Sequence, residues 1–172
     1  MGPDALFPGA NDNASGVAMM LELAQWFSTH KPKHNLLFVA FAGEEAGLVG
    51  SEWFAVDRPI DLSKVKLMLN LDILGTGDDG IMAVNATAEQ ALYDRMVAVN
   101  TKGGFVKEVR ARGPACNSDH CPLVKRGVPA LFLYTLGGAA HYHDVNDKGA
   151  SLTLKAFAPI HALLRTFIAQ VK

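Results

Sequence analysis

Two adjacent carboxylates, Glu44 and Glu45, follow an apolar run from Leu36 to Ala42. The run has the composition of an interior strand. A buried strand that ends in two carboxylates holds them at a sheet edge, where their charge is costly unless something binds it. Neighbouring residues of an extended segment point to opposite sides. One carboxylate can therefore bind a cation while the other acts on a water or a substrate, as a metal-dependent hydrolase requires.

Three further candidate metal ligands also occur at the ends of predicted segments. Asp12 lies at a helix start, Asp72 closes an apolar stretch, and His143 lies in the loop 137–148. Taken singly, they read as a helix cap, a turn residue and a solvated surface histidine. Ligands of open α/β sheets gather outside the carboxyl ends of the strands. Carboxylates with an imidazole suit zinc, and manganese or cobalt less well. The full set therefore predicts a metal site.

The elements that must position these residues alternate along the chain. Helical spacing of apolar residues predicts helices over 13–29, 47–56, 87–99, 118–125 and 154–171. Apolar or alternating runs predict strands over 36–41, 65–73, 81–85, 105–109 and 130–134. This order predicts an α/β fold, a three-layer αβα sandwich around a central mixed, mostly parallel sheet. No repeat or linker divides the chain, so residues 1–172 are expected to form a single catalytic domain.

The composition excludes several classes of function. The 172 residues carry 16 basic and 17 acidic side chains and a net charge of −1, so we expect neither nucleic acid nor an anionic membrane as partner. The longest apolar runs have strand length, well short of the roughly 20 residues of a membrane span. Cys116 and Cys121 are five residues apart; they form either a short disulfide loop or a reduced pair, and they do not fix a compartment.

Five segments, taken together, resemble the two-zinc aminopeptidases in order and spacing. That family includes glutamate carboxypeptidase, and its fold is shared with the glutaminyl cyclases. The resemblance spans nearly the whole chain, and its motifs are specific in combination. The segments are Gly9–Gly16, Gly43–Leu48, Asn70–Asp72, Ser118–His120 and Tyr142–His143.

The resemblance implies a zinc cofactor, peptide substrates and hydrolysis of an amino-terminal peptide bond. Asp12 resembles the carboxylate that bridges two zinc ions, with a cis peptide bond to Asn13. Ser118–His120 is similar to a motif near the substrate pocket, without a firm role for any of its residues. The other implied roles are general base for Glu44, ligand of one zinc for Glu45 and His143, ligand of the other zinc for Asp72, and stabilisation of the oxyanion for Tyr142.

One family feature has no counterpart in the sequence. The family has a further histidine ligand, in a His-x-Asp motif shortly before the segment that matches Asp12, and Met1 begins eleven residues before Asp12. We therefore expect a domain without its N-terminal strands, holding one zinc or none instead of two, with impaired activity. A bare sheet edge favours homodimerisation. The compartment stays open; the family is often exported, which is compatible with a periplasmic or secreted parent protein.

Two other functions remain open. A glutaminyl cyclase works with one zinc and a ligand set similar to Asp12, Glu45 and His143, although residues 46–51 resemble the peptidase branch. A binding module of the same fold would be catalytically inactive, yet every ligand position within the span of this chain is filled. Cyclisation of an amino-terminal glutamine would identify the first alternative, and zinc-dependent hydrolysis would exclude the second.

Overall fold

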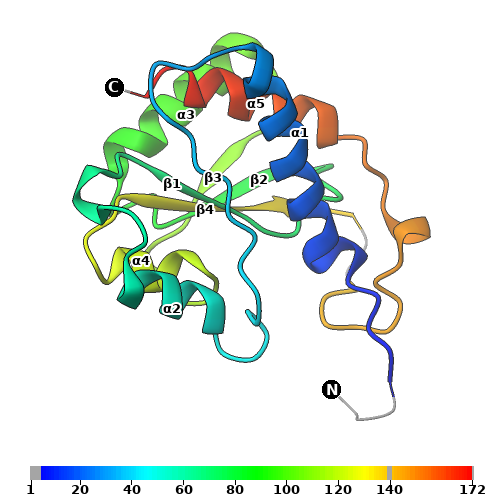
Figure 1. The fold of residues 1–172 in the computed structure, drawn as a ribbon. Helices are drawn as coiled ribbons and strands as arrows, with labels where there is room; N and C mark the ends of the chain where they lie inside the picture. The colour runs from blue at the N-terminus through cyan, green and yellow to red at the C-terminus, as the bar shows by residue number, and fades with distance from the viewer. Residues whose placement is uncertain (1–4, 139–140, 172) are drawn as a thin grey trace.

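The predicted alternation of strands and helices is present in the computed structural model, which describes residues 5–138 and 141–171 (Figure 1). The helices are α1 (Gly16–Thr29), α2 (Val49–Asp57), α3 (Gln90–Gly103), α4 (His120–Val124) and α5 (Phe157–Ile168), with short helical turns η1 (Ala10–Ser15), η2 (Leu62–Lys64) and η3 (Gly149–Ser151). The strands are β1 (Met68–Leu71), β2 (Gly80–Val84), β3 (Val109–Ala111) and β4 (Ala130–Leu136).

The four strands form one open sheet in the order β1-β4-β2-β3. β1 pairs in parallel with β4, and β2 in parallel with β3, whereas β2 and β4 are antiparallel. The sheet is therefore mixed and mostly parallel, as predicted. Because β1 and β4 run in the same direction, their carboxyl ends meet at one edge of the sheet, and Asp72 follows β1 directly at that edge.

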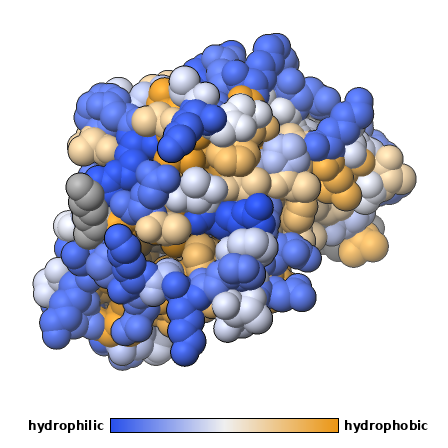
Figure 2. Space-filling view, turned by 90° about the horizontal axis from the view of Figure 1, so that it is seen from above, coloured by the Kyte–Doolittle hydropathy of each residue, from blue (hydrophilic) through white to orange (hydrophobic). Residues whose placement is uncertain are grey.

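Helices cover both faces of the sheet, which confirms the predicted three-layer sandwich. α1, α3 and α5 lie on one face, and α2 and α4 lie on the other (Figure 1). The larger core lies under the first layer and includes the fully buried Met19, Leu133 and Phe167. A smaller core under α2 and α4 includes Phe54 and Leu123. Seen from the side of the first layer, hydrophilic residues lie among apolar ones, as expected of a solvent-facing surface (Figure 2).

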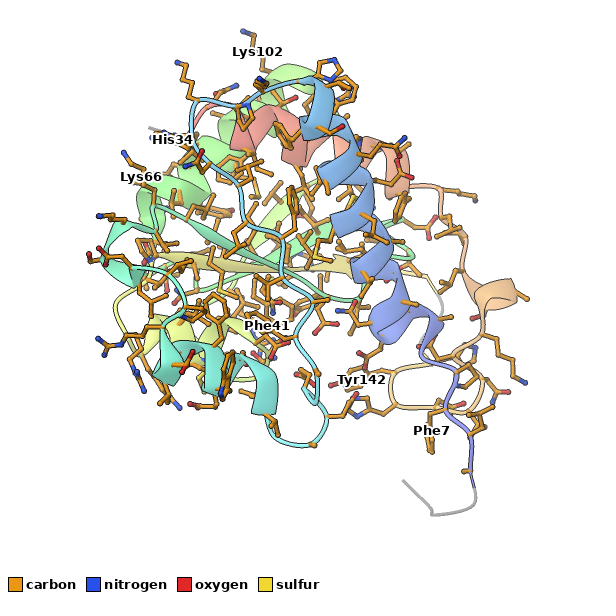
Figure 3. The ribbon with its side chains drawn as sticks, in the orientation of Figure 1. Phe7, His34, Phe41, Lys66, Lys102 and Tyr142 are labelled. Carbon is orange, nitrogen blue, oxygen red and sulfur yellow. A yellow bond between two sulfur atoms is a disulfide. The ribbon has the colours of Figure 1, made fainter. Side chains whose placement is uncertain are left out.

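The expected interior strand over 36–41 is wrong. The segment is extended but unpaired, since no backbone hydrogen bond joins residues 36–41 to any strand of the described chain. It crosses the β1 edge of the sheet from the layer of α1 to the layer of α2, between the labelled His34 and Phe41 (Figure 3). Leu37 is 58% exposed. The apolar composition predicted a buried strand, but burial requires neighbouring strands on both sides, and in the described chain this segment has neither.

The bounds of several predicted elements differ from those observed, and two of the differences have a clear cause. The helix expected from residue 13 begins at Gly16, because Asp12 and Asn13 have non-helical backbone angles. The edge strand expected over 105–109 begins at Val109. The Asn100 side chain binds both the N–H and the carbonyl of Val106, so this segment is held to the end of α3 instead of to the sheet.

Among the described residues, no helix has the length and apolar character to cross a bilayer.

Candidate active site

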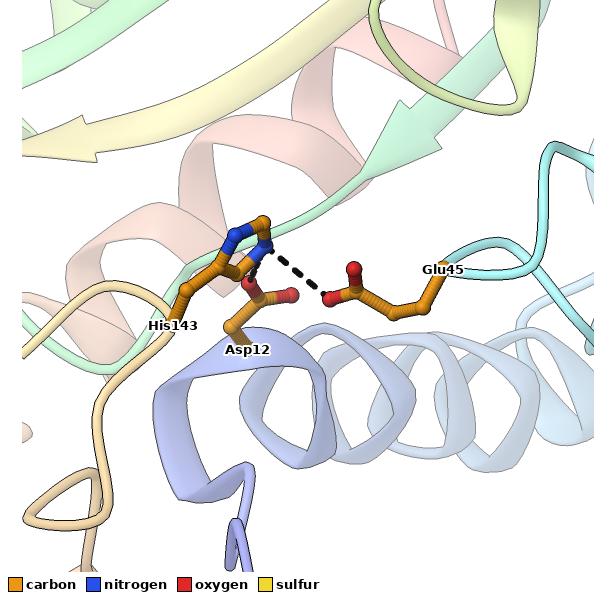
Figure 4. Close-up of side chains that lie close together, drawn as sticks. All are labelled: Asp12, Glu45 and His143. Atoms are coloured by element: carbon orange, nitrogen blue, oxygen red, sulfur yellow. Dashed lines mark ion pairs between the residues drawn. The ribbon is translucent and has the colours of Figure 1, made fainter. Parts of the chain in front are cut away.

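Three of the predicted ligands converge from segments far apart in the sequence (Figure 4). The Nε2 atom of His143 lies 3.2 Å from Oδ2 of Asp12 and 3.0 Å from Oε1 of Glu45. One ligand atom of each residue lies within 4.8 Å of the other two. The Asp12 side chain is 14% exposed, and those of His143 and Glu45 are 39% and 46% exposed. The site is thus shielded on one side and open to solvent on the other.

The geometry of these three groups fits a zinc ion. Tetrahedral zinc with nitrogen and oxygen ligands at about 2.1 Å separates the ligand atoms by about 3.4 Å. The two measured separations from Nε2 of His143 are near this spacing. Two carboxylates and one imidazole are also a donor set that zinc accepts, with a position left open for water or substrate. The three residues could therefore hold one zinc without a large rearrangement.

Polar side chains of the loop 10–15 hold Asp12 at the end of β1. The Asn13 side chain donates to the Leu71 carbonyl (3.0 Å) and accepts the N–H of Ile73 (3.2 Å). Asn11 accepts the N–H of Gly75 through Oδ1 (2.8 Å). These side-chain amides give backbone groups at the end of β1 and after it the hydrogen-bond partners that a neighbouring strand would otherwise provide. The peptide bond between Asp12 and Asn13 is cis, as the sequence resemblance implied.

A tight turn places Glu44 and Glu45 in front of α2. The carbonyl of Glu44 accepts the N–H groups of Gly47 (2.9 Å) and Leu48 (2.8 Å), and the N–H of Gly50 donates to Ala42 (2.8 Å). The two side chains therefore leave a turn and not the end of a paired strand. Glu45 nevertheless reaches His143, whereas Glu44 lies outside the three-residue cluster.

Asp72 is near the three ligands but not part of their cluster. Its Oδ2 atom accepts the Ser118 hydroxyl at 3.0 Å, and Ser118 in turn accepts the Asn70 amide at 2.7 Å. Asp72 is 8% exposed, and its Oδ1 atom is buried without a hydrogen-bond partner among the described residues. An orphaned buried carboxylate oxygen calls for a missing partner, such as a cation.

The concentration of carboxylates raises several pKa values. Burial, followed by the charges of Asp72 and Glu45, raises the pKa of Asp12 to about 6. Burial, followed by the same two charges, raises the pKa of Glu44 to about 7. Burial also raises the pKa of Asp72 and of Asp119. Among the described residues, no lysine or arginine forms an ion pair with this cluster, so a divalent cation would relieve the repulsion between its carboxylates.

Tyr142 lies beside the cluster with its ring stacked on His143, at a centroid distance of 3.8 Å and an interplanar angle of 21°. It is 65% exposed. Burial, with Asp12 and Glu45 as the next causes, raises the pKa of the Tyr142 hydroxyl above its usual value. The phenol therefore keeps its proton at neutral pH and can donate a hydrogen bond.

Sequence reasoning singled out the segment Ser118–His120 without assigning a role to Ser118, and it missed Asp147 altogether. Ser118 orients Asp72, and it lies in a loop closed by a disulfide between Cys116 and Cys121. Asp119 accepts the buried Ser51 hydroxyl at 2.6 Å. Asp147 is 2% exposed and binds the backbone of Asn11 and Asp12. The only sequence signal for Asp147 was an acidic residue four positions after a candidate histidine ligand.

Comparison with known sequences places the chain in a family. The model of peptidase family M28 matches residues 2–168. A probable zinc metalloprotease of Pyrenophora teres f. teres (strain 0-1) is 48% identical over 75 residues, which are 42% of this chain and 16% of that protein. A probable zinc metalloprotease of Pyricularia oryzae is 46% identical over 82 residues, which are 46% of this chain and 16% of that protein. The chain thus spans a small part of these relatives.

Solved structures share the fold. An aminopeptidase from Aneurinibacillus sp. strain AM-1 superimposes with a TM-score of 0.81 at 27% identity, over 96% of this chain and 40% of that one. A zinc aminopeptidase from Bacillus subtilis gives 0.81 at 23% identity, over 94% and 42%. A glutaminyl cyclase from an Acidobacteriales bacterium gives 0.76 at 21% identity, over 98% and 64%. The two matches below 25% identity show likeness of fold only.

Proposed function

The chain belongs to peptidase family M28, and from this premise we propose that it is a zinc-dependent aminopeptidase that hydrolyses the amino-terminal bond of peptides. The observation that carries the proposal is the convergence of Asp12, Glu45 and His143 on one point. Bound there, zinc would polarise a water or a carbonyl group and so supply the electrophile of the reaction.

Glu44 is the proposed general base. It is adjacent in sequence to the ligand Glu45, and burial raises the pKa of its carboxyl to about 7 in the zinc-free site, so this carboxyl can exchange a proton near neutral pH. A base with this pKa can take a proton from the attacking water. It can then return the proton to the departing amine, so that no net proton is consumed on the enzyme.

Tyr142 is the proposed donor to the oxygen that gains negative charge. Its hydroxyl stays protonated at neutral pH, and its ring is stacked on the ligand His143. A donor at this place stabilises developing charge on the substrate carbonyl oxygen. The carboxylates around the site favour a substrate that presents a cationic amine, which supports selectivity for chain ends.

Glu44→Gln tests the assignment of base and ligands. The variant is expected to lose at least about a thousandfold in hydrolysis, since the amide cannot accept the proton, and to retain bound zinc. His143→Ala is expected to lose both the hydrolysis and the bound zinc. Zinc is counted by elemental analysis after dialysis, and hydrolysis is followed by amino-acid release from a panel of dipeptides. Unchanged hydrolysis by the Glu44→Gln variant would refute the role of Glu44.

We propose that the chain binds one zinc rather than two. The three-ligand cluster suffices for one ion, whereas a second would have only Asp12 and Asp72 as protein ligands among the residues discussed. Two carboxylates without a third ligand hold zinc weakly. Activity is accordingly expected to be lower than that of a site with a full ligand set, and two tightly bound zinc ions per chain would contradict the proposal.

Glutaminyl cyclisation is the second candidate, because a site with three protein ligands is sufficient for a single-zinc enzyme. In this reaction the α-amine of an amino-terminal glutamine attacks its own side-chain amide and ammonia leaves. Ammonia release from glutaminyl peptides, without release of a free amino acid, would favour the cyclase over the peptidase.

We also propose self-association through residues 36–41. Leu37 and Phe38 are exposed, and the segment borders a hollow of about 360 Å³ between α1 and residues 31–38. Antiparallel pairing with a second copy would satisfy the unpaired backbone of both chains.

A further inference from the structure

Asp147 binds the backbone of the loop that carries the ligand Asp12. Its carboxylate accepts the N–H of Asn11 through Oδ1 and Oδ2 (2.8 and 3.0 Å) and the N–H of Asp12 through Oδ2 (2.9 Å). Its carbonyl accepts the N–H of Ala10 at 3.2 Å. Three consecutive N–H groups of one ligand loop thus donate to a single residue of another.

We propose that Asp147 is a positioning residue, which holds the backbone of Asp12 where its carboxylate can share a cation with His143. The inference rests on the proposed function for its catalytic meaning, since it takes Asp12 and His143 as zinc ligands.

The burial of Asp147 shows how strongly the two loops depend on each other. At 2% exposure its carboxylate has little access to water, and none of the ion pairs among the described residues includes it. Backbone N–H groups are therefore its partners, in charge-assisted hydrogen bonds that are stronger than neutral ones. Removal of the carboxylate would leave the N–H groups of Asn11 and Asp12 without this acceptor.

A turn connects Asp147 rigidly to the ligand His143. The N–H of Asp147 donates to the carbonyl of Asp144 at 3.0 Å, and the N–H of Asn146 donates to the Asp144 carboxylate at 2.8 Å. His143 directly precedes this turn. Asp12 is therefore connected to His143 in two ways. One is indirect, through Asp147 and this turn, and the other is the direct contact of 3.2 Å between Oδ2 of Asp12 and Nε2 of His143.

Asparagines hold the other side of the same loop. The side chains of Asn11 and Asn13 reach out of the loop and bind the backbone after β1. Asp147 differs because it binds the N–H of Asp12 itself. Outer partners that orient a metal ligand commonly affect metal affinity by roughly 10–100-fold when they are removed.

The test compares Asp147→Asn with a matched control, Asp57→Asn, in the full chain. Both changes replace one carboxylate by an amide and remove one negative charge. Asp57 is the exposed last residue of α2, outside the metal-ligand loops. Zinc affinity is measured by competition with a chromogenic chelator. Asp147→Asn is expected to raise the zinc Kd at least about tenfold, and the control is expected to stay within about twofold of the wild type.

A second readout requires no metal. In the zinc-free protein, hydrogen exchange of the Asn11 and Asp12 amides is expected to accelerate at least about tenfold in Asp147→Asn and to stay unchanged in the control. The amide keeps one acceptor oxygen for these two N–H groups and turns a donor toward them, whereas the carboxylate offers them both of its oxygens. Unchanged exchange, or a zinc Kd within twofold of the wild type, overturns the inference. A wild-type chain that binds no zinc refutes the proposed function instead, and the exchange measurement still decides the role of Asp147.

If Asp147→Asn does not fold, the conservative variant Asp147→Glu takes its place in the test. It keeps the charge and both acceptor oxygens but moves them by one methylene group. The same two measurements are applied to it with the same thresholds. Excess zinc is further expected to restore most of the hydrolysis lost in either variant, since a positioning residue acts through occupancy of the cation site and not on the chemical step.

Discussion

At the scale of single residues, the site is a group of acidic side chains whose charges oppose one another. Burial and neighbouring carboxylates raise the pKa of Asp12 to about 6 and of Glu44 to about 7. Such a group destabilises the folded chain wherever it is ionised and no cation is bound. A cost of this kind is expected at a functional site and is recovered when the ligand binds.

The cost of Glu44 predicts a pH-dependent gain in stability for Glu44→Gln. The pKa of Glu44 is raised in the folded chain from 4.5 to about 7. Below about pH 4.5 its carboxyl is neutral in both states, and as the pH rises through 7 the folded chain loses the stability that protonation gave it. The variant should therefore melt higher than the wild type at pH 8, by about 4 °C after allowance for partial solvation, and gain much less at pH 5.

Differential scanning fluorimetry in a chelating buffer at the two pH values checks this expectation. Glu52→Gln, the same change on the partly exposed first turn of α2, serves as the control and should give no comparable pH-dependent gain. An equal gain for Glu44→Gln at pH 5 and pH 8 would mean that charge repulsion at Glu44 is not the cause.

At the scale of elements, close packing joins the start of α1 to the end of β1. A Cβ atom on Gly16 would lie 2.2 Å from the carbonyl oxygen of Leu71 and 2.3 Å from Oδ1 of Asn13. Gly16 therefore permits the contact by which Asn13 binds both the Leu71 carbonyl and the Ile73 N–H. The position of Asp12 depends on this contact, because Asp12 is the residue before Asn13.

Gly16→Ala is accordingly expected to separate α1 from the end of β1. The clash involves backbone as well as side-chain atoms, so it should lower the free energy of unfolding by about 1–3 kcal/mol and weaken zinc binding. Denaturant unfolding and chelator competition measure the two effects. Gly149→Ala is the control, since no atom lies within 4 Å of the added Cβ there. Equal stability of the two variants would contradict the proposed packing.

At the scale of the whole molecule, the sheet has an open edge at β1 that the segment 36–41 crosses without pairing. An extended apolar segment with free backbone groups is a template for another strand. The exposed Leu37 and Phe38 lie on this segment. The same feature that contradicts the predicted interior strand thus supports the proposed self-association.

Leu37→Glu tests this proposal. A charge at this position should disfavour burial between two chains and shift the wild-type dimer toward monomer, by at least about tenfold in the dimer Kd. Leu154→Glu, at another exposed leucine on a different surface, is the control. Sedimentation equilibrium measures the association. A monomeric wild type at all accessible concentrations, or a dimer unaffected by Leu37→Glu, would contradict the proposal.

The sequence by itself determined the fold class and the candidate metal ligands. Strand and helix periodicities are local properties of the chain, and strand ends carry ligands because parallel strands finish at a common edge. Asp12, Glu45 and His143 were predicted from their side-chain types, from their places at the ends of predicted segments and from the family resemblance. The structure brings the three together, although the segment before Glu45 is not a strand. Asp72 was also placed at its strand end, although it lies outside the three-residue cluster.

Only the tertiary structure decided which of these residues touch and what holds them. Residues 36–41 have no strand partner in the described chain, whereas the partners of Ser118 and Asp147 are distant in sequence, and no local pattern records either fact. A strand is a strand only if another strand pairs with it, and a buried carboxylate is tolerated only where the fold supplies donors. Both conditions depend on contacts between segments that propensity cannot supply.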